Sequence, residues 1–132
     1  MAVFESDQQL YSVLQSVFDR LAAEPRNADK LAKTNLVLRM NFTDPAAQVM
    51  LDGRHPATEV FYGPTPGKAN MEFSMSADLL HHIWMGDMST SQAFFSGQIK
   101  TKGNFMKAMQ LIELFRECER VYPAVAAEYD LQ

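Results

Sequence analysis

Apolar residues recur every three or four positions near the start of the chain. Between Ser6 and Leu21, leucines, valines and a phenylalanine follow this spacing, which is typical of an amphipathic helix. Ser6 and Gln9, three residues apart, form a capping-box pattern at its beginning. The pattern therefore predicts a helix over residues 7–23, and a short second helix is expected over residues 28–32.

The pattern then changes to alternation of apolar and polar positions. Alternation runs over residues 35–42, apart from Val37, and over residues 70–76. Residues 47–51 are expected to form a further strand, as are residues 58–62, which are rich in strand-forming types. Asp-Pro, Asp-Gly and Gly-Pro signals separate these segments and favour turns. We interpret them as strands of an antiparallel meander that turns one face to solvent.

Helical spacing returns in the second half of the chain. An apolar stripe predicts a helix over residues 77–85, with Ser76 as its N-cap, and a Ser-x-x-Gln capping box predicts a short helix that ends at Phe95. A long apolar pattern predicts a helix over residues 105–122, which Pro123 should break or kink.

A compact sequence of signals joins these last helices. Gly97 suits the left-handed position that closes a helix, residues 98–102 alternate like a short exposed strand, and Asn104 is a good N-cap. The complete order is helix, strands, helices, strand, helix, which predicts an α+β fold. A length of 132 residues predicts a single domain, residues 1–132.

Composition restricts the classes of function. A net charge of −4 offers no electrostatic reason to bind nucleic acid, whose affinity depends on neutralised phosphates. Cys118 is the only cysteine, so no internal disulfide forms and a reducing compartment is favoured. The N-terminus is acidic where a signal peptide is basic, and no apolar stretch reaches membrane-spanning length. We therefore expect a cytoplasmic protein.

Motifs for catalysis or metal binding are weak. His81 and His82 are adjacent, so on a helix they point about 100° apart, and we interpret them as solvated or capping residues. Residues 63–68 resemble a phosphate loop but contain two prolines and lack the final Ser or Thr. Glutamates flank Cys118 and should raise its pKa, which makes it a poor nucleophile. We predict no metal, no cofactor and no catalytic residue.

Methionines and lysines leave two interpretations open. Nine methionines, together with the aromatic residues, form either an ordinary core or an adaptable apolar binding surface. Lys100, Lys102 and Lys107 form either a solvated basic patch or a site of weak, transient attraction to anionic lipid headgroups.

The stretch from Phe94 to Leu111 combines three short motifs, which are Phe94-Phe95-Ser96-Gly97, then Ile99-Lys100-Thr101-Lys102-Gly103-Asn104, then Ala108-Met109-Gln110-Leu111. With these motifs the chain resembles the sterol carrier protein 2 (SCP2-like) family. That family shares an apolar pair, Ser-Gly, a Lys-containing strand, Lys-Gly-Asp or Lys-Gly-Asn, and an apolar helix. The order of predicted elements agrees over nearly the whole chain. The last three residues lack the peroxisomal tripeptide of some relatives, so a peroxisomal location is not implied.

The resemblance implies a fold and a function. The fold would be a five-stranded, mainly antiparallel sheet covered by helices, which enclose an apolar tunnel for a sterol, a fatty acid, a fatty acyl-CoA or another lipid. The function would be lipid binding or transfer without catalysis. Apolar faces within the matching segments place these residues near the tunnel: Leu36, Leu38, Met40, Phe73, Met75, Leu80, Ile83, Trp84, Phe94, Phe95, Ile99, Phe105, Met109 and Ile112.

Two alternatives compete with a lipid carrier. The first is a small cone-shaped enzyme of the NTF2-like kind, which would need long strands in the second half of the chain and an acid or base in its pocket. The second is an interaction module that binds no lipid. The sequence leaves the identity of the lipid and the oligomeric state open.

Overall fold

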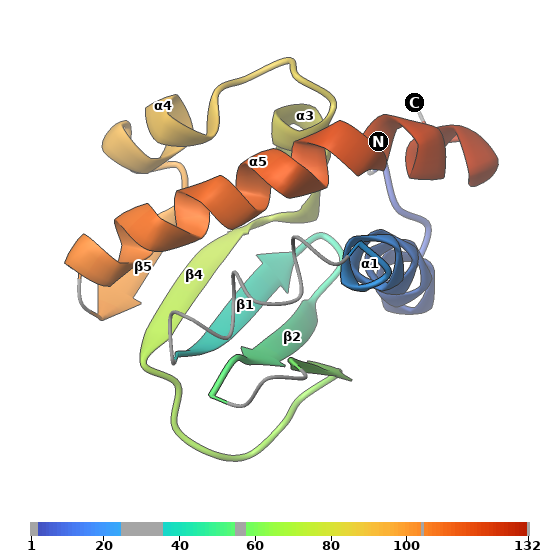
Figure 1. Ribbon diagram of the computed structural model, residues 1–132. Helices are drawn as coiled ribbons and strands as arrows, with labels where there is room; N and C mark the ends of the chain where they lie inside the picture. Colours follow the sequence, from blue (N-terminus) through green and yellow to red (C-terminus); the bar gives the residue numbers. More distant parts are fainter. Residues whose placement is uncertain (1–2, 25–35, 55–57, 104, 132) are drawn as a thin grey trace.

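The computed structural model describes residues 3–24, 36–54, 58–103 and 105–131, and for residues 105–111 the backbone alone. Figure 1 shows the arrangement of the elements. In chain order they are α1 (Asp7–Ala22), β1 (Val37–Thr43), β2 (Ala47–Asp52), β3 (Glu59–Tyr62), β4 (Met71–Ser76), α3 (Ala77–Trp84), α4 (Thr90–Phe95), β5 (Lys100–Gly103) and α5 (Phe105–Glu128). The α+β prediction is confirmed. The helix predicted over 28–32 lies outside the described residues.

The strands form one five-stranded sheet in the order β3-β2-β1-β4-β5. All neighbours are antiparallel except β1 and β4, which run parallel. The predicted mainly antiparallel sheet is confirmed, but the prediction of a meander is wrong for β4. That strand pairs with β1 and not with β3, because alternation of residues determines which face a strand presents but not which neighbour it takes.

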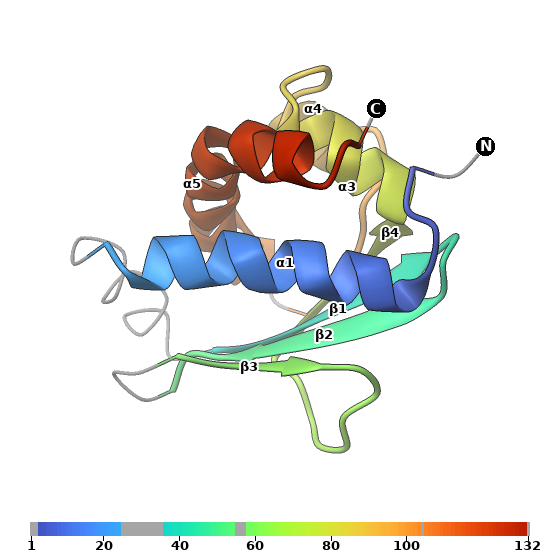
Figure 2. The same ribbon diagram turned by 90° about the vertical axis from the view of Figure 1, so that its right-hand side faces the viewer.

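The two faces of the sheet differ in chemistry. Figure 2 shows α1, α3 and α5 on one side of the sheet. The opposite face is polar: the Asn41 side-chain amide donates to Glu72 at 3.2 Å and accepts from the Gln48 amide at 2.9 Å. Arg39 on the same face donates to the carbonyl of Gly67 at 2.7 Å. The predicted wet face is therefore present, and it is tied to the loop that follows β3.

Serine caps begin three of the helices as predicted. The hydroxyls of Ser6, Ser76 and Ser89 accept from backbone N–H groups at 3.1, 3.1 and 3.4 Å. In α1 the Gln9 side chain reaches back to the N–H of Glu5, one residue before the cap, at 2.7 Å. Each cap satisfies a donor that the first turn leaves without an intrahelical partner.

Helix α5 continues through Pro123 to Glu128. Of the two effects expected of Pro123, a break at residue 122 is therefore wrong, and a kink stays a prediction. Proline removes one backbone N–H and crowds the preceding turn, a local cost that packing against other elements can offset. Here α5 packs along α1, where Arg20 forms an ion pair with Glu128 and Ser16 shares a hydrogen bond of 3.2 Å with Tyr129.

Two glycines shape the connection from α4 to α5. Gly97 ends α4 with φ of 82°, the left-handed position predicted for it. Gly103 has φ of 121°, and a Cβ atom built there would lie 2.4 Å from the carbonyl oxygen of Asn70. β5 therefore approaches the start of β4 as closely as a glycine permits. The N-cap predicted at Asn104 lies outside the described residues.

Candidate functional site

The interior between the sheet and the helices contains the hydrophobic core of the described residues. The parallel register of β1 and β4 places Leu38 beside Met71, Met40 beside Phe73 and Phe42 beside Met75. All six side chains are buried. They form one continuous core cluster with the apolar stripes of α1, α3 and α5. A row of large side chains on neighbouring strands thus faces the helices.

Five aromatic rings run through this interior in sequence, and we call them the aromatic ladder. Phe94 of α4 contacts Phe73 of β4 with ring centroids 5.0 Å apart, and Phe73 contacts Phe115 of α5 at 5.8 Å. Phe115 contacts Trp84 of α3 at 5.7 Å, and Trp84 contacts Tyr122 at 5.5 Å. Each pair meets edge to face, the arrangement that aromatic quadrupoles favour. The ladder connects four elements.

A buried polar pair lies at one end of the aromatic ladder. His81 Nδ1 and the Tyr122 hydroxyl share a hydrogen bond of 2.7 Å, and both residues are at most 1% exposed. Burial raises the pKa of Tyr122, so its hydroxyl stays protonated. The sequence interpretation of His81 as solvated or capping is wrong, because this face of α3 packs against α5. His82 lies one residue further around the helix and its side chain is 49% exposed.

Trp84 has a buried indole nitrogen that forms no hydrogen bond. It is the only tryptophan of the chain and is 1% exposed. Its Nε1 is buried and has no hydrogen-bond partner. Two further side-chain atoms in the described part of the chain share this state, Arg39 Nε and Thr58 Oγ1. Arg39 lies on the polar face of the sheet. Of these three residues, Trp84 is the one that belongs to the aromatic ladder.

The structure brings most of the predicted ligand-binding residues together. Ten are buried: Leu36, Leu38, Met40, Phe73, Met75, Leu80, Ile83, Trp84, Ile99 and Ile112. Phe94 is half-buried and contacts the ring of Phe73. Phe95 lies at the surface with 69% exposure, because it follows Phe94 by one residue on a short helix. The side chains of Phe105 and Met109 lie outside the described part of the structure.

Several residues of the interior were not among the fourteen predicted ligand-binding residues. Phe115 and Tyr122 occupy two rungs of the aromatic ladder, and Val49 and Leu51 of β2 lie on the inner face of the sheet. Phe115 shares the helical face of Ile112, so its spacing was a usable signal. Tyr122 precedes Pro123, where the helix was expected to end, and its inward position depends on the continuation of α5.

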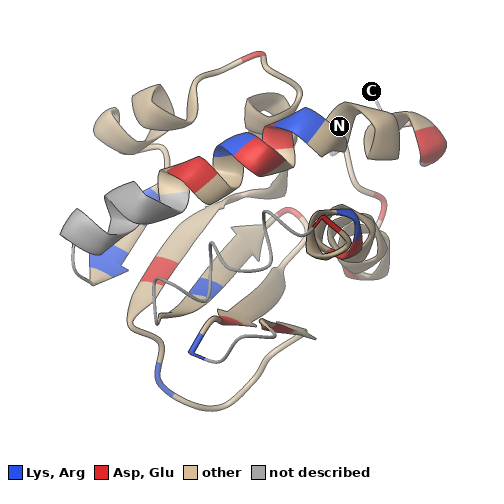
Figure 3. Ribbon diagram, in the orientation of Figure 1, with Lys and Arg blue, Asp and Glu red and all other residues tan. Residues whose placement is uncertain are grey.

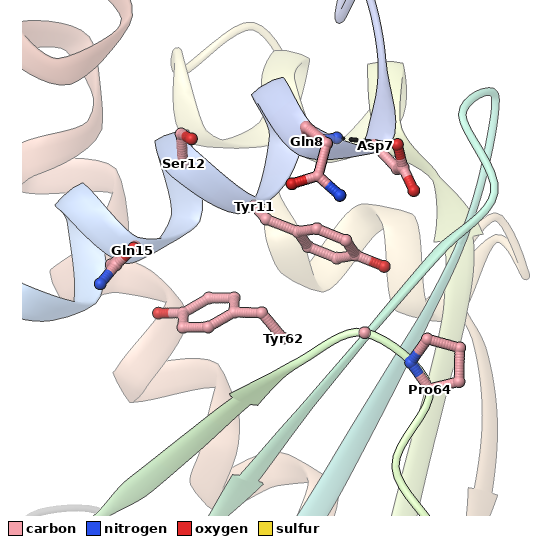
Figure 4. A pocket seen from close by; sticks show the side chains of 8 residues that line it. Asp7, Gln8, Tyr11, Ser12, Gln15, Tyr62 and Pro64 are labelled. Atoms are coloured by element: carbon pink, nitrogen blue, oxygen red, sulfur yellow. Dashed lines mark hydrogen bonds between the residues drawn. The ribbon is translucent and has the colours of Figure 1, made fainter.

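A hollow of about 390 Å³ lies outside this interior, between α1 and the end of β3 (Figure 4). Tyr11 and Tyr62 face each other across it with ring centroids 6.2 Å apart, and Asp7, Gln8 and Gln15 line its rim. Burial, with a contribution from Asp19, raises the pKa of Tyr62. The hollow is open to solvent and its lining is a mixture of polar and apolar groups, whereas the predicted tunnel is enclosed and apolar.

A second hollow of about 260 Å³ lies between the segment that joins α3 to α4 and the outer side of α5. Ser89, Thr90, Arg116 and Glu119 are among the residues that line it. None of the fourteen predicted ligand-binding residues lines either of these two hollows. The tunnel therefore remains a prediction.

Chemically reactive groups are scarce in the described residues. Cys118 is buried, and burial raises the pKa of its thiol, to which Glu117 and Glu119 add. Its thiolate is thus disfavoured, as the sequence predicted. Within the described ranges, no group of three His, Cys, Asp or Glu residues could hold a metal ion. In the same ranges no helix is both long and apolar enough to cross a membrane.

Basic residues mark one edge of the sheet. Figure 3 shows them on β5, where Lys100 and Lys102 are exposed. The antiparallel register places Lys102 beside Glu72 of β4, on the polar face. These lysines therefore project away from the aromatic ladder. The side chain of Lys107, the third residue of the predicted basic patch, is not described.

Comparisons with known proteins agree on the fold. Sterol carrier protein 2 from Yarrowia lipolytica, in its apo form, matches with a TM-score of 0.63 and 21% identity over 83% of this chain and 89% of that chain. The sterol carrier protein domain 2 of Helicoverpa armigera matches with a TM-score of 0.68 and 18% identity over 84% of this chain and 88% of that chain. These TM-scores show a shared fold, and at identities below 25% the likeness shows the fold alone.

Sequence comparison shows the family. The chain is similar to the mouse peroxisomal multifunctional enzyme type 2, with 28% identity over 88 residues, which are 64% of this chain and 12% of that enzyme. The chain thus corresponds to about an eighth of the length of this relative. A model of the SCP-2 sterol transfer family matches residues 14–116, which include, in whole or in part, the four helices and five strands of the described residues. The resemblance noticed in the sequence is confirmed, and the chain belongs to the SCP-2 sterol transfer family.

Proposed function

We propose that this protein binds one apolar molecule in the interior around the aromatic ladder and carries it between lipid environments. Candidates are a sterol, a fatty acid, a fatty acyl-CoA or another lipid. The observation that supports this proposal most directly is the placement of large aromatic and methionine side chains on one continuous inner surface of an SCP-2 fold. Methionine suits such a surface because it is flexible and polarizable.

Binding must be coupled to opening of the interior. Ligand pockets begin at roughly 300 Å³, and a dry cavity costs about 24 cal/mol per Å³. A rigid, empty cavity of that size would therefore cost about 7 kcal/mol, against a total stability of about 5–15 kcal/mol for a domain. The ligand-free protein should thus close around its core, and ladder residues such as Phe73 and Phe115 should separate when lipid enters.

The proposal includes no catalytic step. The one thiol lies in the core with a raised pKa, and the His81 imidazole is engaged by the Tyr122 hydroxyl. We further propose that the protein works in the cytoplasm and contacts membrane surfaces only transiently, through residues such as Lys100 and Lys102.

Native mass spectrometry of freshly purified protein tests this function. We expect adducts of one lipid per chain, which disappear after extraction with solvent and return when a long-chain lipid is added. Lipid at 100 times its dissociation constant should stabilise the fold by about 2.7 kcal/mol. A melting temperature that does not move with saturating sterol, fatty acid or fatty alcohol, in a protein that also carries no adduct, would refute the proposal.

A second candidate function is a lipid-presenting module that serves an enzyme. It is favoured by the relationship to the mouse peroxisomal multifunctional enzyme type 2, of which the matched segment is 12%. Such a module would bind the same apolar molecules and deliver them to a catalytic partner. The native mass spectrum distinguishes the two cases, because a hetero-complex that persists after lipid is removed indicates the module.

A further inference from the structure

The Trp84 indole N–H is a buried donor without an acceptor. Trp84 is 1% exposed and its Nε1 has no hydrogen-bond partner. Buried polar side-chain atoms are mostly paired in native proteins, and an unpaired one carries the full cost of its lost hydration. The absence of a hydrogen-bond acceptor for this N–H therefore requires a specific physical explanation.

The neighbours of Trp84 do not supply that reason. The Phe115 ring lies 5.7 Å away, edge to face, and the Tyr122 ring lies 5.5 Å away. An N–H group that points at a ring face recovers only part of a normal hydrogen bond. The Tyr122 hydroxyl is the other polar group of the ladder; it shares a hydrogen bond of 2.7 Å with His81 Nδ1 and is not a hydrogen-bond partner of Trp84 Nε1. Tryptophan is usually placed where its N–H reaches a partner.

We propose that Trp84 Nε1–H is the hydrogen-bond donor that receives the polar end of the bound molecule. This inference rests on the proposed function and adds an anchor point to it. An indole donates and cannot accept. The polar end of the ligand must therefore carry an acceptor oxygen, as a hydroxyl, a ketone or an ester does. The apolar remainder would then lie along the aromatic ladder, towards Phe73 and Phe94.

The charge of the interior selects among such acceptors. The buried polar residues of the described ranges are His81 and Thr90, and no lysine or arginine is among them. A buried carboxylate without a positive partner loses its hydration at a cost of several kcal/mol or more. A neutral head group is therefore favoured over an ionised fatty acid. The structure thus assigns the site to long-chain or fused-ring alcohols, ketones and esters.

The intact wild-type protein allows a direct test by NMR. A chain with one tryptophan gives one indole N–H cross-peak, and Trp84→Phe confirms its assignment by removing it. The probes are 1-hexadecanol and hexadecane, each presented from a cyclodextrin. We expect hexadecanol to move the indole proton downfield, as hydrogen bonding does, and hexadecane to leave it without that downfield shift.

Dissociation constants by calorimetry complete the test. Trp84→Phe keeps an aromatic ring but removes the donor, so it should weaken hexadecanol binding by about tenfold and hexadecane binding by about twofold at most. Phe115→Leu is the matched control, because it replaces the aromatic ring next to Trp84 by a smaller side chain and removes no polar atom. It should change the affinities for both probes by the same factor.

The outcomes separate this inference from the proposed function. If both probes bind but the indole proton shifts equally with each, or if Trp84→Phe affects both affinities equally, the anchor is refuted and the lipid carrier stands. If hexadecanoate at pH 8 binds more tightly than hexadecanol, the assignment to neutral head groups is wrong. If hexadecanoate binds and neither probe does, the anchor falls and the lipid carrier stands, whereas if neither probes nor hexadecanoate bind, both fall together.

Discussion

Replacing Tyr122 by phenylalanine isolates the energy of the buried polar pair in the interior. The substitution keeps the ring of the aromatic ladder and removes the hydroxyl that meets His81 Nδ1 at 2.7 Å. Both residues are at most 1% exposed, so water does not replace the lost partner. The His81 nitrogen then loses a hydrogen bond in a place where it cannot be hydrated.

The expected size follows from that burial. A buried polar group deprived of its partner costs about 1–3 kcal/mol. The unfolding entropy is ~0.28 kcal/mol per kelvin for 132 residues at the average value per residue. The melting temperature of Tyr122→Phe should therefore lie about 4–11 °C below that of the wild type.

Thermal unfolding followed by circular dichroism measures this shift. Tyr129→Phe is the matched control, since it removes a half-buried hydroxyl that meets Ser16 Oγ at 3.2 Å and donates to the exposed Ser12 carbonyl at 3.3 Å. Water can take over this contact, so we expect a loss of about 0.5 kcal/mol or less at this site. Equal melting temperatures for the two variants would show that the buried pair contributes no more than a surface hydrogen bond.

Three further changes test other parts of the structure. Gly103→Ala should destabilise the fold by more than about 3 kcal/mol in urea unfolding, because its Cβ would meet Asn70 O at 2.4 Å. Gly86→Ala is the control: it has open space around it and should cost only about 1–2 kcal/mol of backbone strain. Similar losses of stability for the two variants would contradict the close approach at Gly103. Ser6→Ala should cost about 1 kcal/mol, measured in the same way, and no loss would mean that the cap is dispensable. The pKa of Cys118 is raised by burial, so stability should fall above about pH 9, where only the unfolded thiol ionises, by up to about 1.4 kcal/mol per pH unit. Cys118→Ala should reduce that slope, and an unchanged slope would assign it to other groups.

Local signals in the sequence predicted the elements well. Serine caps, periodic apolar positions and turn residues act within a few residues of each other, so they are readable along the chain. The helix predicted over 7–23 is observed as Asp7–Ala22, and the strand predicted over 47–51 is observed as Ala47–Asp52. Family membership also followed from a local motif, the stretch between Phe94 and Leu111.

Contacts between residues far apart in the sequence could not be predicted from such local signals. Each alternating segment presents one apolar face, and several pairings bury that face equally well. The parallel pairing of β4 with β1 therefore emerged only from the assembled sheet. The same limit applies to the side chain of His81. From the sequence it was predicted to be solvated or capping, because the contact of its Nδ1 with Tyr122 of α5 forms only in the folded structure.

The sequence by itself thus determined the elements, the family and most of the apolar residues that face inward. The tertiary structure decided the strand order, the sequence of rings in the aromatic ladder and the isolation of Trp84 Nε1. The physical reason is the distance along the chain over which each interaction acts. Periodicity and caps depend on neighbours along the chain, whereas hydrogen-bond satisfaction in a core depends on groups that only folding brings together.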